Sequence, residues 1–289
     1  MPSRVSTIPP EARKGRITVS ERLHIPAGIN PRVPSVARMY DYYLGGKDHF
    51  AADREAAEQF IRLLPGIREI ALANRGFLAR SVDHAARSGI SQFLDIGSGL
   101  PTQENVHEVA HRVVPEARVV YVDNDPIVLS HGRALLADSP GTTVVAGDMR
   151  EPARLFTNPE ITTQIDFTRP VAVLMVAMLH FISDHDLVAH IIDVIRGKLV
   201  AGSHLIVSHA FEGDADTMTR EAGQRIYRAT NTGSLTSRGP DDLAALVKDM
   251  ELLEPGIVPV HAWRPADTEE PVPFDPDKPG ILALVARQP

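Results

Sequence analysis

The order of hydrophobic and polar positions along the chain predicts a helical segment followed by an alternation of strands and helices. Between residues 35 and 89, apolar side chains recur at intervals of three and four, the period of an amphipathic helix. Glycines and a Pro-Gly pair interrupt this pattern, and such residues end helices. The predicted helices of this segment span residues 35–44, 51–64 and 67–87.

From residue 90 onward, short apolar runs alternate with amphipathic segments, as in a parallel sheet with helices on both faces. Residues 171–176 are almost entirely aliphatic, which is typical of a central strand, and we expect Ser183 and Asp186 to cap the helix that follows. The pattern predicts an α/β fold with a Rossmann-like, seven-stranded, mostly parallel sheet. The other predicted strands span residues 90–96, 118–122, 142–146, 202–209, 256–263 and 280–287. The other predicted helices span residues 102–113, 126–137, 215–230 and 241–250.

The same pattern divides the chain into three regions. Residues 1–34 contain several prolines and little apolar periodicity, which indicates a flexible N-terminal arm. Residues 35–89 are expected to form a helical cap. Residues 90–289 are expected to form the ligand-binding domain.

Composition narrows the classes of function. The formal net charge of -7 argues against a surface that follows a nucleic-acid backbone. The chain has no cysteine, which excludes thiolate metal sites and cysteine nucleophiles and agrees with a reducing cytoplasm. No apolar run reaches the ~18 residues of a membrane span, and the histidines lack H-E-x-x-H spacing. We expect a cytoplasmic protein with no metal and with neither a nucleic-acid nor a membrane partner.

The stretch "FLDIGSGLPT" runs from a predicted strand into a glycine turn. Such glycines let the backbone approach a ligand closely. A dinucleotide fingerprint needs a third glycine, but Pro101 and Thr102 stand in its place. Asp95 lies just before the turn, where its charge disfavours a pyrophosphate and suits the ammonium group of a cofactor with an amino-acid end.

Two further acidic residues follow the next strands. Asp123 in "VVYVDNDP" is placed to bind a ribose diol, and Asp148 in "VVAGDMR" to accept from an adenine amino group while Met149 covers the ring. Either aspartate alone is equally typical of a turn or a helix cap. All three carboxylates end strands at one sheet edge, and together with the glycine turn they favour an adenosyl cofactor.

These segments resemble the motifs of class I S-adenosylmethionine-dependent methyltransferases: "FLDIGSGLP", "VVYVDNDP", "AGDMRE" and "VAVLMVAMLHFIS". In addition, "ARMYDYYLGGKDHFAADREAA" and "ANRGFL" resemble the N-terminal signature of an actinobacterial S-adenosyl methyltransferase family formerly listed as a domain of unknown function. The resemblance implies the class I fold and S-adenosyl-L-methionine as cofactor. Leu100 and Pro101 depart from the family's usual glycine after the turn.

The resemblance also implies roles for individual positions. The expected cofactor-binding residues are Arg75, Gly97, Ser98, Gly99, Asp123, Asn124, Asp148, Met149 and Ala177. Gly97, Ser98 and Gly99 are expected beside the methionine and ribose parts, Asn124 beside the adenine, and Ala177 beside the methionine part. Arg75 either faces the methionine carboxylate or is a surface arginine with a buried stem.

Methyl transfer depends mainly on positioning the acceptor and excluding water, and only some acceptors need a base. His180 follows the fourth strand and is a candidate base or acceptor-orienting group, or a structural histidine. His209 and Glu212 end the fifth strand and are further catalytic candidates. The candidate substrate-binding residues are Tyr42 and Tyr43 in the cap and Tyr227 on the later polar helix; packing of these rings is the alternative.

The segment after the fourth strand lacks the Asn/Asp-Pro-Pro-Tyr/Phe motif of amino-group enzymes that act on nucleic-acid bases or glutamine. We expect a small-molecule acceptor, an aromatic indole or phenolic secondary metabolite, methylated at oxygen, nitrogen or a ring carbon. A non-catalytic sensor that binds S-adenosylmethionine is the main alternative. A nicotinamide oxidoreductase is disfavoured by the incomplete glycine fingerprint and Asp95.

Overall fold

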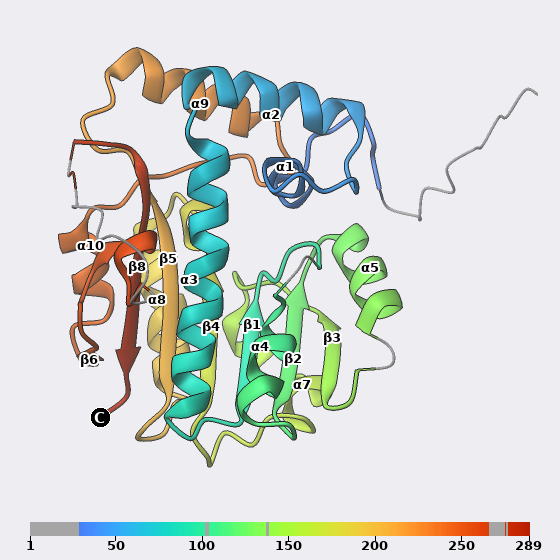
Figure 1. The fold of residues 1–289 in the computed structure, drawn as a ribbon, viewed down its shortest axis with the longest axis vertical. Coiled ribbons are helices and arrows are strands. Elements are labelled where there is room, and N and C mark those ends of the chain that lie inside the picture. The colour runs from blue at the N-terminus through green and yellow to red at the C-terminus, as the bar shows by residue number, and fades with distance from the viewer. Residues whose placement is uncertain (1–28, 102–103, 137–138, 266–274, 276) are drawn as a thin grey trace, which may run out of the picture.

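A mixed sheet forms the centre of the molecule in the computed structural model, which describes residues 29–101, 104–136, 139–265, 275 and 277–289. The strands follow the order β3-β2-β1-β4-β5-β8-β6, and β7 pairs with β8 beside this path (Figure 1). The pairs among β1 to β5 are parallel, whereas β8 is antiparallel to β5, β6 and β7. The strands are β1 (Gln92–Ile96), β2 (Arg118–Asp123), β3 (Thr142–Ala146), β4 (Ala172–Val176), β5 (His204–Phe211), β6 (Glu251–Leu252), β7 (Val258–Pro259) and β8 (Gly280–Arg287).

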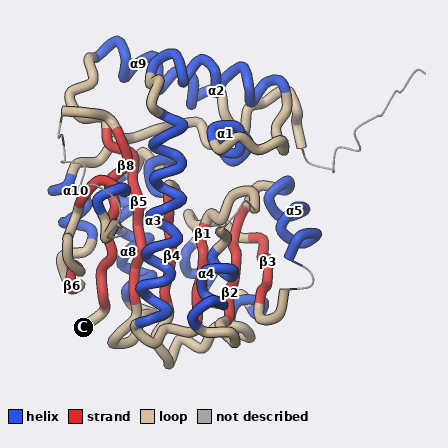
Figure 2. The backbone as a smooth tube through the Cα atoms, viewed as in Figure 1, coloured by secondary structure: helices blue, strands red, loops and turns tan. Residues whose placement is uncertain are grey.

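Helices cover both faces of the sheet, as Figure 2 shows. On one face α3 and α4 pack against the strands through a cluster that includes Phe77 and Trp263. On the other face, α8 presents Val188, Ile191 and Ile195 to the aliphatic strands. The helices are α1 (Val36–Tyr43), α2 (Ala51–Leu63), α3 (Ile67–Arg87), α4 (Val106–Val113), α5 (Pro126–Leu136), α6 (Pro152–Leu155), α7 (Pro159–Thr162), α8 (His185–Arg196), α9 (Thr217–Arg228) and α10 (Pro240–Leu246), with the short 3-10 turns η1 (Leu179–Phe181) and η2 (Val260–Ala262).

The predicted α/β fold and its mostly parallel sheet are confirmed, but three local predictions are wrong. The last predicted helix ends at Leu246, and the chain then forms β6, so that the described part of the sheet has eight strands instead of the predicted seven. The predicted strand over residues 256–263 contributes only β7 before it turns into η2. The N-cap of α8 is Asp184, which accepts hydrogen bonds from the backbone N–H groups of Asp186 and Leu187 at 2.9 and 3.1 Å.

Two consecutive N-terminal helices and a third helix from a distant part of the sequence form a roof over the carboxyl edge of the parallel strands. The roof consists of α1, α2 and α9, and Figure 1 shows α2 and α9 together above the sheet. Its buried apolar cluster consists of Met39, Tyr43, Ala56, Ala57, Ala71 and Tyr227. The first turns of α3 belong to this cluster, whereas the rest of α3 packs on the sheet, so one continuous helix joins the roof to the core.

A buried carboxylate fixes the position of the chain where α1 begins. Asp53 is fully buried and pairs with the Arg38 guanidinium, whose Nε lies 2.7 Å from Oδ2. Asp53 also accepts hydrogen bonds from the backbone N–H groups of Ser35 and Phe50. The Ser35 hydroxyl donates to Asp125, two residues after β2, at 2.8 Å. The start of α1 is therefore tied to the strand edge that it covers.

Among the described residues, no helix is both long and apolar enough to cross a membrane.

Candidate functional site

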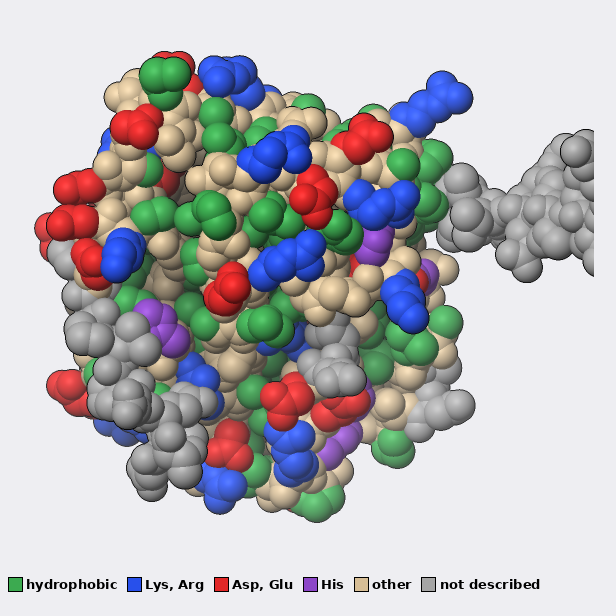
Figure 3. All heavy atoms as spheres, turned by 45° about the horizontal axis from the view of Figure 1, so that its top comes forward, with side chains coloured by type: hydrophobic (Ala, Val, Ile, Leu, Met, Phe, Trp, Pro, Cys, Tyr) green, Lys and Arg blue, Asp and Glu red, His purple; other side chains and the backbone are tan. Residues whose placement is uncertain are grey.

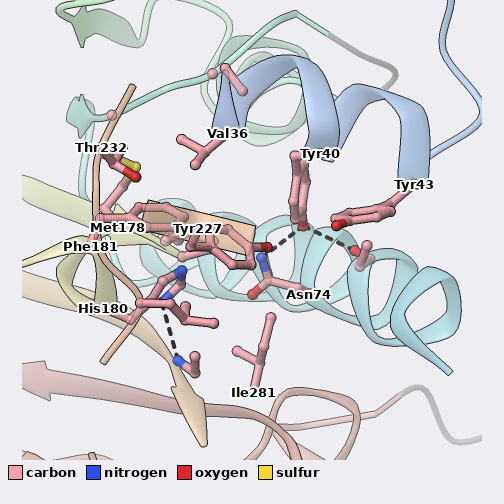
Figure 4. A pocket seen from close by; sticks show the side chains of 18 of the residues that line it. Val36, Tyr40, Tyr43, Asn74, Met178, His180, Phe181, Tyr227, Thr232 and Ile281 are labelled. Atoms are coloured by element: carbon pink, nitrogen blue, oxygen red, sulfur yellow. Dashed lines mark hydrogen bonds between the residues drawn. The ribbon is translucent and has the colours of Figure 1, made fainter. Parts of the chain in front are cut away.

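A cavity of about 270 Å³ lies between the roof and the carboxyl edge of the sheet. Figure 4 shows it from close by, with Tyr40 and Tyr43 entering from α1 and His180 and Phe181 from the turn after β4. All nine predicted cofactor-binding residues line this cavity. Of the other predicted site residues, His180, Glu212, Tyr43 and Tyr227 line it, whereas His209 and Tyr42 do not.

The glycine turn after β1 is held against the end of β2. The N–H groups of Gly97 and Ser98 both donate to the carbonyl of Val122. Gly97 and Gly99 have φ angles of 78° and 67°, in the left-handed region that glycine adopts without strain. A Cβ atom on Gly97 would clash with the Met178 side chain, so the close approach also favours glycine.

Asp123 stabilises this turn and faces the cavity. One carboxylate oxygen accepts from the Gly99 N–H at 3.0 Å, and the other from the Asp125 N–H at 2.9 Å. Because a carboxylate oxygen has more than one acceptor position, both oxygens can still accept from the two hydroxyls of a ribose. Burial raises the pKa of Asp123, partly offset by these backbone hydrogen bonds.

Asp95 and Arg75 form the part of the cavity beneath the glycine turn. Asp95 is 4% exposed, and burial raises its pKa to about 7, although the positive charge of Arg75 opposes the shift. The Arg75 guanidinium donates to the carbonyl of Glu104 at 3.0 Å. A carboxylate beside a guanidinium suits the zwitterionic end of an amino acid, because each charged end then has an opposite partner.

Asp148 and Met149 follow β3, the outermost of the parallel strands. Asp148 accepts hydrogen bonds from the Arg150 guanidinium and, at 3.4 Å, from the Asn124 side chain. Burial opposes ionisation of Asp148, but these hydrogen bonds outweigh it and lower its pKa. Asn124 is exposed, and Met149 is half-buried, so both are accessible from the cavity.

A chain of hydrogen bonds connects the roof to the end of β4. The N–H of Ala177 donates to the Ser208 hydroxyl, which in turn donates to Asn74 at 2.7 Å. The Asn74 amide donates to the Tyr40 hydroxyl at 2.9 Å, and Tyr40 donates to the carbonyl of Ala71 (Figure 4). Ala177 has a φ of 57°, a strained conformation for alanine at the point where β4 meets the cavity.

The two histidines near the fifth strand differ in position. His209 is fully buried; its Nδ1 lies 2.8 Å from the carbonyl of Ala210 and its Nε2 lies 3.0 Å from the Arg238 guanidinium. It therefore holds Arg238 and does not reach the cavity. His180 lies 5.5 Å from His209, ring centroid to ring centroid, and its Nδ1 accepts a hydrogen bond from the Ala210 N–H at 3.1 Å.

The tyrosines also separate into two groups. The Tyr42 hydroxyl donates to Glu58 at 2.5 Å, and its ring lies beneath the Arg68 guanidinium, away from the cavity. Tyr43 and Tyr227 are buried, and Tyr227 contacts the ring of Phe60 edge to face, with centroids 5.1 Å apart. Glu212 lines the cavity and pairs with Arg220 at 3.6 Å.

Several lining residues were not predicted as site residues. Asn74 lies on α3 amid apolar positions, and a polar residue on a helix face that packs on a sheet is a usable signal. Phe60 and Phe181 carried no comparable signal, because an aromatic residue in a helix or after a strand is typical of packing.

The fold and this cavity define a class I methyltransferase. A family model described as S-adenosyl methyltransferase matches residues 23–289. The chain belongs to this S-adenosyl methyltransferase family, and its cofactor is S-adenosylmethionine.

Two solved structures are similar to this chain over most of its length. A protein from Thermobifida fusca YX, described as a candidate methyltransferase, is 42% identical, with a TM-score of 0.83 and coverage of 92% of this chain and 98% of the other. A DUF574 family protein from Streptomyces avermitilis is 40% identical, with a TM-score of 0.80 and coverage of 89% and 98%. A search of curated proteins found no match.

Proposed function

We propose that the protein transfers the methyl group of S-adenosylmethionine to a small aromatic acceptor, an indole or phenolic metabolite, at oxygen, nitrogen or a ring carbon. The observation that carries the proposal is the aromatic lining of the cavity where the roof meets the strand edge. Tyr43, Phe60, Phe181 and Tyr227 supply flat apolar walls, and aromatic walls favour a flat ligand.

The cofactor would occupy the strand-edge side of the cavity. Asp123 would bind the ribose hydroxyls, Asp148 the adenine amino group, and the glycine turn would border the ribose and methionine parts. Arg75 and Asp95 have the charges that the carboxylate and ammonium groups of the methionine part require. When bound, the cofactor supplies an electrophilic methyl group on a positively charged sulfur.

The chain's own residues would then position the acceptor and exclude water. A lone pair on oxygen or nitrogen, or a π electron pair of a ring carbon, would form the bond to the methyl carbon, while the electrons of the carbon–sulfur bond would return to sulfur. An acceptor that carries a proton on that atom releases it. Glu212 is a lining carboxylate at the end of β5 that could take this proton, and its partner Arg220 lies on α9.

The surface supports a small acceptor more than a polymer. In the space-filling view of Figure 3, basic and acidic side chains alternate over the roof, and no continuous basic stripe crosses the described part of this face. A protein that follows a phosphate backbone would gather positive charge along its path.

Turnover tests the proposal. Purified protein is incubated with S-adenosylmethionine and a panel of phenols, indoles and nitrogen heteroaromatics, and both S-adenosylhomocysteine and methylated product are measured by mass spectrometry. We expect the two products in equal amounts for at least one compound. Micromolar cofactor binding without any S-adenosylhomocysteine across the panel would favour a sensor that binds the cofactor without turnover.

A further inference from the structure

His180 is held in a single protonation form by the backbone of β5. Its Nδ1 accepts the Ala210 N–H at 3.1 Å, and a ring nitrogen that accepts a hydrogen bond must carry a lone pair. In the neutral ring the hydrogen is therefore on Nε2. In Figure 4, the second ring nitrogen of His180 points away from Ala210 and toward Tyr227. Among the described residues, the hydrogen bond of His180 is made through Nδ1, whereas Nε2 is not among the fully buried atoms and is open to the cavity.

The surroundings of His180 disfavour a second proton on the ring. The side chain is 5% exposed, and burial lowers its pKa well below the ordinary value, with contributions from His209 and Arg238. Arg238 is itself buried and donates to the carbonyls of Leu179 and Ile182, on either side of His180. A charged imidazolium here would lie beside a fixed positive charge.

The Tyr43 hydroxyl lines the same cavity and is buried beside the Tyr227 hydroxyl, with which it interacts. The Nε2–H of His180 therefore shares the cavity with tyrosine hydroxyls. A ring donor without a protein acceptor in a binding cavity points to a ligand that supplies the acceptor atom.

We propose that His180 donates a hydrogen bond from Nε2 to an oxygen of the aromatic acceptor, so that the substrate class is an aromatic ring bearing a phenolate or carbonyl oxygen. In this role His180 orients the acceptor and does not remove its proton. The identity of the ligand as a methyl acceptor rests on the proposed methyl transfer. The position of the hydrogen on the His180 ring does not depend on it.

The protonation form can be measured directly. Long-range nitrogen–proton NMR spectra of 15N-labelled protein distinguish the two neutral histidine forms, and the Phe181 ring, 4.3 Å from the His180 ring by centroids, provides an assignment contact in the unmodified protein. We expect hydrogen on Nε2 and a lone pair on Nδ1 at pH 7. A hydrogen on Nδ1, or a charged ring at that pH, overturns the proposal.

Two substitutions test the roles of the two ring nitrogens of His180 separately. His180→Asn retains an oxygen that can accept from Ala210 but removes the donor, whereas His180→Gln carries an N–H donor near the Nε2 position. The probes are indan-1-one and indane, which share a bicyclic skeleton and differ by one carbonyl oxygen. Their affinities are measured by NMR titration on protein saturated with S-adenosylhomocysteine.

We expect the unmodified protein and His180→Gln to bind indan-1-one about 2- to 10-fold more tightly than indane. His180→Asn should lose this preference. Equal affinity for both probes in the unmodified protein, or an undiminished preference in His180→Asn, overturns the assigned substrate class. Failure of all three proteins to bind S-adenosylmethionine contradicts the proposed methyl transfer instead, and the NMR measurement of the free protein still decides the role of the ring.

Discussion

At the scale of single residues, three carboxylates line the cavity, and each has different neighbours. Asp123 is held by two backbone N–H groups, Asp148 by Arg150, and Asp95 faces the Arg75 guanidinium. A cofactor with a positive sulfur and an ammonium group benefits from all three charges. In the free protein, however, Asp95 resists ionisation because it is enclosed at the base of the cavity.

The buried Asp95 makes folding stability depend on pH. Its pKa of about 7 in the folded protein lies above the ordinary value of 3.8 for an exposed aspartate carboxyl. The folded state therefore holds a proton that the unfolded state releases between these values, and stability falls as pH rises from about 4 to about 7. The full effect is on the order of 4 kcal/mol.

Urea unfolding of the cofactor-free protein and of Asp95→Asn at several pH values tests this. As pH increases across this range, the free energy of unfolding of the unmodified protein should fall relative to that of Asp95→Asn. A constant difference would show that Asp95 titrates normally.

At the scale of elements, most of the sheet and its helices follow from periodicity, because burial of one helix face or of both strand faces leaves a repeating pattern. The wrong predictions concern the elements in which the periodic pattern is weakest. The strands β6 and β7 have two residues each, too few to establish a period. The α8 cap falls on Asp184 instead of Ser183 because Asp184 has the extended backbone, with ψ of 112°, that presents its carboxylate to the first turn.

The buried ion pair of Arg38 on α1 and Asp53 on α2 should dominate the stability of the roof. Asp53→Ala leaves the Arg38 guanidinium buried without its carboxylate, and removal of one partner of a buried pair costs about 3–5 kcal/mol. The measurement is the free energy of unfolding in urea.

Asp83→Ala is the matched control. Asp83 pairs with Arg87 at the same distance of 2.7 Å, but on the surface of α3, where water screens the charges and such pairs contribute little to stability. A similar small loss in both variants would contradict the structural role given to Asp53.

At the scale of the whole molecule, the sequence placed the cofactor residues on one edge because parallel strands share their carboxyl ends. The nine positions expected at the cofactor line one cavity, and their roles stay predictions. The sequence could not show that α9 packs on α2, because contacts between distant segments leave no local pattern. For the same reason, it could not separate His180, at the cavity, from His209, which holds Arg238.

The central claim is that the cavity beneath the roof binds S-adenosylmethionine through the strand-edge carboxylates. Calorimetric titration of the unmodified protein with S-adenosylmethionine and with NAD, each separately, tests it most directly. Asp123→Ala is measured alongside, with Glu116→Ala as control, because Glu116 is an exposed carboxylate just before the amino end of β2, at the sheet edge opposite Asp123.

We predict that S-adenosylmethionine binds and NAD does not. Asp123→Ala should weaken the binding about 10- to 100-fold, because hydrogen bonds to a charged group contribute about 1.5–3 kcal/mol, and Glu116→Ala should leave it unchanged. Tight NAD binding without a response to S-adenosylmethionine, or an Asp123→Ala variant with full affinity, would contradict the account.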